Sequence, residues 1–170
     1  WNLPETGFLW VTAVFAVILA IYTAFLFAQA KGRDFWQSPT LPLHMLVHSL
    51  LAGGAVFAIM SLVFDFSLWN SLVRHILLAG IVVNVLTLVS ELTITHPTKA
   101  AKKVVHMILK EEYKNKFWIG TVLLGNVIPL ILLLTTGNMI LLGVSGVLVL
   151  IGMYITEKIW IEGPQRIPLA

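Results

Sequence analysis

The sequence predicts an all-α membrane protein, a single helical bundle of about five transmembrane helices plus one amphipathic interfacial helix. Three observations support this fold class. Hydrophobic residues make up 58% of the 170 residues and charged residues only 11%, a balance that a soluble domain cannot keep out of water. Five separate apolar stretches come close to the roughly 20 residues that cross a hydrocarbon core. A lysine-rich segment lies between the third and fourth stretches.

Polar turns and prolines delimit the first three predicted spans. We expect the first at about residues 7–30, ending at the charged turn 31–34, because lipid cannot solvate charged groups. The second, at about 41–64, is entered through two prolines, which suit the first turn of a helix because its amides have no intrahelical partner. The third follows at about 72–95.

The segment at about 97–115 differs from its neighbours, because its apolar residues recur at helical spacing opposite a face rich in lysine. That pattern predicts an amphipathic helix resting on the membrane surface. The fourth and fifth spans, at about 117–135 and 139–154, then form a helical hairpin around a short uncharged turn.

The distribution of basic residues predicts the orientation. With the loops alternating sides, every one of the eleven Lys and Arg residues except Arg74 lies on the same side. The positive-inside rule places that side, with the C-terminus, in the cytoplasm. We expect the membrane itself to be a bacterial inner (plasma) membrane. The formal net charge of +3 then suits anionic lipid headgroups and indicates no nucleic-acid partner.

Few ionisable residues lie inside the spans, and each is a functional candidate because its burial in lipid is costly. His44 and His48 stand four residues apart on one face of the second span, and Glu91 lies near the same end of the third. Consecutive spans are antiparallel, so these residues lie at similar depth and can meet across one helix interface. We therefore expect a wet pocket there that opens to the cytoplasm. We predict proton transfer by His44, His48 and Glu91, with Asn84 as a polar station near mid-membrane.

Other polar residues have a simpler interpretation. Hydroxyl groups in spans commonly bond to their own helix or a neighbouring one, so we expect either that role or an extension of the pocket for Ser49, Thr87, Ser90 and Thr93. The remaining acidic residues near the basic side have the pattern of interfacial charges: Glu111, Glu112, Glu157 and Glu162.

Metal and redox centres are not expected in the chain itself. It has no cysteine, which excludes thiolate zinc sites and cysteine-ligated iron–sulfur clusters. A bis-histidine haem is disfavoured because His75 lies at the opposite side from His44 and His48. The His-x-x-x-His pair can bind zinc, but the sequence supplies no third ligand in a metalloprotease pattern, so no metal site is predicted.

Several stretches of the sequence are similar, in the same order along the chain, to those of a known family of membrane proteins: residues 22–26, 32–36, 38–42, 48–55, 95–98, 117–120 and 163–165. Together they resemble the NrfD family, quinone-interacting membrane subunits that include the polysulfide reductase anchor and the large membrane subunits of alternative complex III. The resemblance covers most of the chain but only the C-terminal half of a typical member, which has two four-helix bundles. We therefore expect a part of a larger subunit, with the quinone pocket outside it.

The resemblance implies a membrane subunit of a quinone-linked respiratory oxidoreductase complex, either non-catalytic or quinone-reactive. Its expected cofactor is menaquinone or ubiquinone, and its expected partners are an iron–sulfur subunit and a molybdopterin or multihaem cytochrome subunit. Proton movement through the helix bundle would accompany electron transfer. Two alternatives remain open at this point: half of a secondary transporter, which predicts solute flux without a redox partner, and a purely structural anchor.

Overall fold

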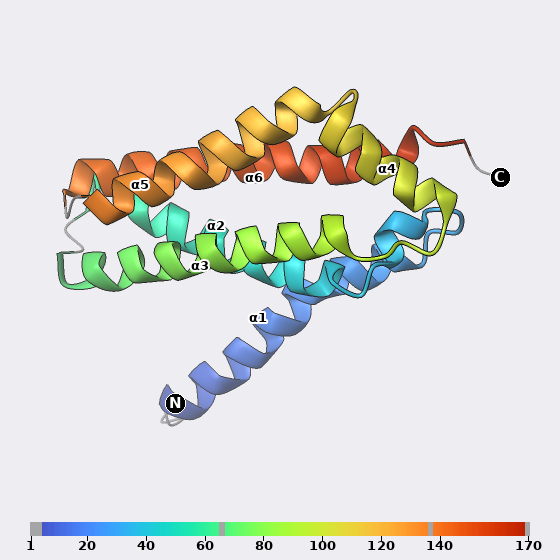
Figure 1. Cartoon of the computed structure of the whole chain (residues 1–170). Coiled ribbons are helices and arrows are strands. Elements are labelled where there is room, and N and C mark those ends of the chain that lie inside the picture. Colours follow the sequence, from blue (N-terminus) through green and yellow to red (C-terminus); the bar gives the residue numbers. More distant parts are fainter. Residues whose placement is uncertain (1–4, 65–66, 136–137, 169–170) are drawn as a thin grey trace.

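The computed structural model describes residues 5–64, 67–135 and 138–168, and all regular structure in these residues is helical (Figure 1). The described part contains five helices long and apolar enough to cross a membrane, which confirms the predicted fold class. The elements are α1 (Glu5–Ala28), η1 (Asp34–Gln37), α2 (Leu41–Met60), α3 (Ser67–Thr93), α4 (Lys99–Lys110), η2 (Lys116–Val127), α5 (Ile128–Thr135) and α6 (Met139–Gln165). The fourth span consists of η2, which is π-helical, followed by α5.

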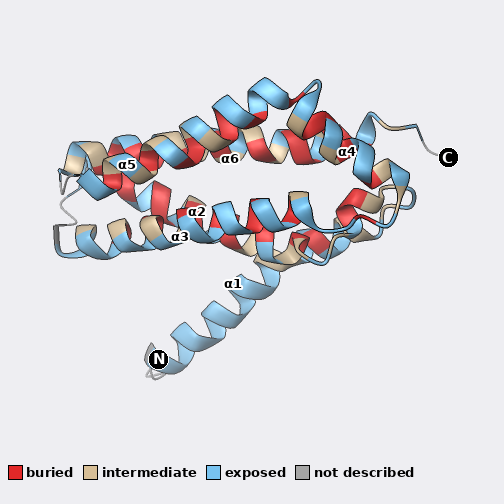
Figure 2. Cartoon of the chain, viewed as in Figure 1, coloured by how far each residue is buried: buried red, intermediate tan, exposed pale blue. Residues whose placement is uncertain are grey.

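Four spans pack as a bundle, whereas α1 leans away from it and meets α2 near its own C-terminal end (Figure 1). Most of α1 is exposed, and so are the outward faces of the other spans (Figure 2). Because lipid tails solvate apolar side chains, these surfaces are expected in a membrane protein. The interior of the bundle is filled by aliphatic residues of α2, α3, α5 and α6.

Small residues set the closest helix contacts. A Cβ atom built on Gly125 of η2 would lie 2.6 Å from the Cα of Gly152 on α6, so the two backbones touch. A Cβ on Gly146 would lie 2.6 Å from the carbonyl oxygen of Ala55 on α2. Close van der Waals packing of this kind is a main driving force for helix association in a membrane, because burying apolar side chains away from apolar lipid contributes little free energy.

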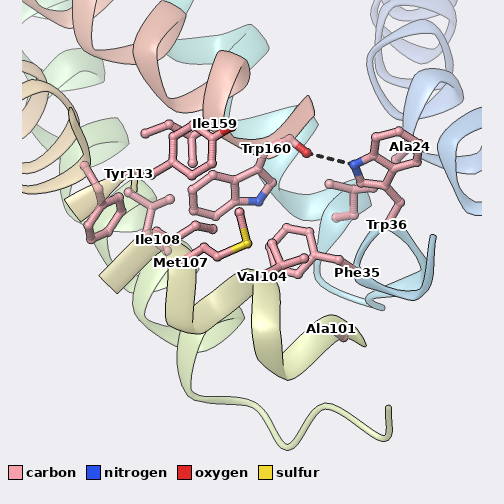
Figure 3. Packing of buried hydrophobic residues seen from close by; sticks show 13 residues of the cluster. Ala24, Phe35, Trp36, Ala101, Val104, Met107, Ile108, Tyr113, Ile159 and Trp160 are labelled. Carbon is pink, nitrogen blue, oxygen red and sulfur yellow. Dashed lines mark hydrogen bonds between the residues drawn. The ribbon is translucent and has the colours of Figure 1, made fainter. Parts of the chain in front are cut away.

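The amphipathic helix α4 begins at Thr98, whose hydroxyl oxygen accepts a hydrogen bond from the Ala101 amide at 3.2 Å. It is shorter than predicted, and its apolar face is directed differently. Val104 and Ile108 are buried against the protein, in a cluster with Trp160 (Figure 3). The helix therefore closes one end of the bundle with its apolar face, whereas that face was expected to rest on lipid.

The boundary predicted for the fifth span was wrong, because α6 continues from Tyr154 to Gln165. Charged residues do not end it, since they lie on separate faces: Lys158 pairs with Glu162 at 3.7 Å on the outside, while Glu157 points to the interior. The end of α6 is held by Arg33, whose guanidinium donates hydrogen bonds to the carbonyl oxygens of Pro164 and Ile167. A cation at the C-terminus of a helix also suits the helix dipole.

The connection between α1 and α2, helix α4 and the end of α6 lie together at one end of the bundle, which we call the basic end (Figure 1). Ten of the eleven Lys and Arg residues belong to these segments or adjoin them. Near the other end, Arg74 Nε donates a hydrogen bond to the Leu133 carbonyl oxygen at 2.7 Å. Arg74 therefore binds the end of α5.

Candidate functional site

The first part of the site joins the start of α2 to the end of α3. His44 Nδ1 lies 2.6 Å from Glu91 Oε2, and both side chains are almost completely buried. Trp160 Nε1 donates a hydrogen bond to the same oxygen at 3.1 Å, and the Thr40 hydroxyl donates to Oε1 at 3.3 Å. A buried carboxyl group is tolerated only when its oxygens have partners, and those of Glu91 have three.

The position of Trp160 is fixed by its own surroundings. Its indole ring packs in an aromatic and aliphatic cluster with Phe35 and Phe117, and its carbonyl oxygen accepts a hydrogen bond from Trp36 Nε1 at 2.8 Å (Figure 3). Aromatic packing and the Trp36 hydrogen bond, which both come from segments far from Trp160 in the sequence, thus hold the part of α6 from which the indole N–H reaches Glu91. The donor to the carboxyl group is therefore preorganised by packing.

Glu157 of α6 is the central residue of the site. Its Oε1 lies 2.6 Å from His48 Nδ1 and 3.6 Å from His44 Nε2. The imidazole rings of His44 and His48 are 4.1 Å apart, and the Glu157 side chain is 29% exposed. We call His44, His48, Glu91 and Glu157 the histidine–carboxylate cluster.

The sequence pattern placed Glu157 among the interfacial charges, and the structure corrects that interpretation. The error followed from ending the fifth span at Tyr154. A signal was present, because no glycine or proline lies between Tyr154 and Gly163, and Glu157 stands three residues before Trp160 on the same face of a continuous helix. The other acidic residues of this region make exposed ion pairs: Glu111 with His106, Glu112 with Arg166 and Glu162 with Lys158.

A chain of amide groups extends from His48 toward the bundle centre. His48 Nε2 lies 3.1 Å from Asn84 Oδ1, and Asn84 Nδ2 donates a hydrogen bond to Asn126 Oδ1 at 2.9 Å. Asn126 Nδ2 in turn donates to the Thr121 carbonyl oxygen at 2.7 Å. Because the amide nitrogen of Asn84 is used as a donor, its oxygen must accept, so His48 Nε2 carries a hydrogen.

The four residues predicted from sequence therefore lie in one network: His44, His48, Glu91 and Asn84. Among the described residues His48 and Glu91 share no hydrogen bond, and the connection between them runs through His44 and Glu157. The hydroxyl groups of Ser49, Thr87, Ser90 and Thr93 donate to carbonyl oxygens of their own helices. These four contacts agree with the simpler of the two interpretations, in which a hydroxyl group bonds to its own helix.

An apolar cleft of about 450 Å³ lies beside the network, lined by side chains of α3 and η2 and by Leu109 of α4. Leu88 and Val122 are among its apolar residues, and Asn126 belongs both to its wall and to the amide chain. The lining suits a lipid acyl or isoprenoid chain. An apolar molecule in this cleft would touch the network at Asn126.

The chemistry of the cluster is that of alternating acids and bases. Two carboxyl groups and two imidazoles are interleaved within hydrogen-bond range or slightly beyond it, so protons can be held and shared among them. His44, His48 and Glu157 also offer three ligand atoms that lie within 4.8 Å of one another. Both properties are rare inside a membrane span.

Comparison with known proteins agrees with this architecture. A family model described as "Polysulphide reductase, NrfD" matches residues 4–165, nearly the whole chain. Searches among curated proteins and among solved structures gave no match. On the extent of the family match, the chain belongs to the NrfD family, membrane subunits of oxidoreductase complexes.

Proposed function

We propose that this chain serves in a quinone-linked respiratory oxidoreductase complex of a bacterial inner membrane, and that its histidine–carboxylate cluster exchanges protons with the cytoplasm. Membership of the NrfD family and the five spans support the first part. One observation carries the second: two carboxyl groups and two imidazoles interleave inside the bundle, near its basic end.

The proposed entrance is at the basic end, which the positive-inside rule assigns to the cytoplasm together with the C-terminus. Ser38 and Thr40 are only half-buried there, and their hydroxyl oxygens are 2.6 Å apart. Thr40 then donates to Glu91, so a line of hydroxyl groups leads from the surface to the first carboxyl group. From Glu91 the order of groups is His44, Glu157 and His48.

The step between His44 and Glu157 requires motion, because 3.6 Å exceeds a hydrogen bond. Glu157 is the residue suited to move, since part of its side chain is exposed and its carboxyl group lies between both imidazoles. Rotation of this carboxyl group would pass a proton from one ring to the other. Asn84 and Asn126 orient His48 in this proposal, because an amide has no group that titrates near neutral pH.

Electron transfer belongs to partners in the proposal. An iron–sulfur subunit, with a molybdopterin or multihaem cytochrome subunit, would exchange electrons with menaquinone or ubiquinone, and this chain would supply protons to that chemistry. The absence of cysteine fits such a division, because the chain offers no thiolate ligands for a cluster.

The test uses the complete complex in proteoliposomes with a pH-sensitive dye and a quinone substrate. We expect Glu91→Gln and Glu157→Gln to slow proton uptake by roughly 10²-fold, the lower end of the usual effect of an acid–base group. Glu162→Gln is the matched control, because Glu162 is partly exposed at the surface and pairs with Lys158.

Subunit composition and spectra of each variant complex must first show intact assembly. If both assembled variants keep the proton stoichiometry and rate of the wild type, the cluster is structural and the proton proposal fails. Solute flux into vesicles without a redox partner would instead favour the transporter alternative.

A further inference from the structure

We infer that His44, His48 and Glu157 form a binding site for a divalent transition-metal ion of the zinc class. The three ligand atoms are His44 Nε2, His48 Nδ1 and Glu157 Oε1, all within 4.8 Å of one another. The sequence pattern offered no third ligand beside the histidine pair, so no zinc site was predicted; in the structure Glu157 supplies that ligand. The inference stands on this geometry and does not depend on the proposed proton exchange.

The state of His44 Nε2 points to a ligand. The side chain is completely buried, and Nε2 has no hydrogen-bond partner among the described residues. A buried polar atom without a partner is costly and calls for an explanation. Because His44 Nδ1 is engaged with Glu91, the neutral ring that donates from Nδ1 leaves a lone pair on Nε2, on the side of Glu157.

The second imidazole is arranged in the same way. His48 Nε2 donates to Asn84, so the neutral ring has its lone pair on Nδ1, 2.6 Å from Glu157 Oε1. Two nitrogen lone pairs and a carboxylate oxygen thus face one another. A proton or a metal cation is required among them to offset their mutual repulsion.

The surroundings match those of known metal-binding histidines. Such histidines almost always donate their other ring N–H to a carboxylate, a carbonyl group or water. Here His44 meets the Glu91 carboxyl group, and His48 meets the Asn84 amide oxygen. A dipositive ion with ionised Glu91 and Glu157 would also leave the buried site neutral, which favours its stability in lipid.

Distances and ligand types favour zinc over hard ions. Bonds of about 2.0–2.1 Å in a tetrahedron place ligand atoms about 3.3 Å apart. The Glu157 Oε1 separations of 2.6 Å and 3.6 Å bracket that value, so small side-chain rotations are sufficient. Imidazole ligands suit zinc, cobalt or nickel, whereas magnesium and calcium prefer oxygen ligands throughout. Three protein ligands leave one position for water or another small ligand.

The experiment uses the purified full chain in lipid nanodiscs, treated with a chelator and then titrated with Co²⁺ and Zn²⁺. We expect one Co²⁺ per chain with the intense visible absorption of a tetrahedral site, displaced by Zn²⁺. X-ray absorption of the zinc form should give a nitrogen and oxygen shell at about 2.0–2.1 Å with imidazole scattering.

Variants decide whether the ion lies at the inferred site. His48→Gln and Glu157→Gln remove ligands and should abolish the tetrahedral signal, while Glu91→Gln removes only the partner of His44 and should weaken affinity by about 10–100-fold. His106→Gln is the control, because His106 is exposed and pairs with Glu111. Helical circular dichroism and thermal unfolding show which variants are folded.

Two results would overturn the inference. One is a wild-type chain without a tetrahedral Co²⁺ spectrum, whatever the variants do. The other is binding that folded His48→Gln or folded Glu157→Gln retains in full, or that His106→Gln alone removes, since the ion would then lie elsewhere than at the inferred site. These readouts concern binding only, so they are independent of proton uptake by the complex.

Discussion

Substitution of Gly152 by alanine is a direct test of the helix packing that supports the site. The new Cβ atom would lie 2.1 Å from the Cα of Gly125 and 3.0 Å from its nitrogen. Carbon atoms in contact prefer about 3.5–4.0 Å, so η2 and α6 must separate locally by about 1.5 Å. No side-chain rotation can relieve this contact, because both partners are backbone.

The cost of Gly152→Ala has two parts. Overpacking of this kind destabilises proteins by about 1–3 kcal/mol. Separation of the helices would also lengthen the hydrogen bond from Thr156 Oγ1 to Thr121 Oγ1, now 2.9 Å, and such interhelical bonds contribute about 0.6 kcal/mol in membranes. We therefore expect the free energy of unfolding to fall by about 2–3 kcal/mol.

Unfolding of the chain in bicelles, followed by steric trapping or by titration with a denaturing detergent, measures this change. Gly53→Ala is the matched control in α2, because a Cβ there would have no atom of the described residues within 4 Å. Alanine is favoured over glycine in a helix by about 0.8–1.0 kcal/mol, so this control should equal or exceed the wild type in stability. Equal stability of Gly152→Ala and wild type would show that the two backbones are not in contact, and the packing account would be refuted.

Two further predictions concern the basic end. Trp36→Phe removes the buried donor to the Trp160 carbonyl oxygen, so the free energy of unfolding should fall by about 1 kcal/mol or more. A decrease smaller than about 0.3 kcal/mol would contradict the role of this hydrogen bond. Burial raises the pKa of Tyr113, and the charges of Glu112 and Glu162 raise it further against the opposing effect of Arg166. The unfolded chain then ionises first, near the usual pKa of about 10, so stability should decline as pH rises through that value. Ultraviolet titration of wild type and Tyr113→Phe checks this, and equal phenol pKa values in the folded and denatured chain would refute it.

The meeting of His44, His48 and Glu91 was predictable because depth in a membrane is set by simple rules. Two consecutive apolar spans must be antiparallel, and their lengths fix how far each polar residue lies from the loop. The histidines stand at the start of α2 and Glu91 at the end of α3, so similar depth followed from counting. Helical periodicity then placed both histidines on one face.

Glu157 and the direction of α4 were not predictable in the same way. A charge near the end of an apolar stretch has the same sequence pattern whether it meets headgroups or a buried histidine, and only packing of α6 on α2 distinguishes them. The apolar face of α4 raises the same ambiguity. Periodicity shows that Val104 and Ile108 avoid water, but lipid and protein interior are both apolar.

The two carboxyl groups of the cluster differ in freedom, and this difference assigns them different roles. Glu91 is fully buried and held by His44, Trp160 and Thr40, so its oxygens are fixed. Glu157 is partly exposed and lies between two imidazoles at unequal distances, so small rotations change which ring it meets. A fixed acid orients His44 and a mobile acid connects the rings, whether the cation between them is a proton or a metal ion. Replacement of Glu157 should therefore interrupt exchange between the histidines, whereas replacement of Glu91 should remove the first carboxyl group of the proton path and also the partner that orients His44.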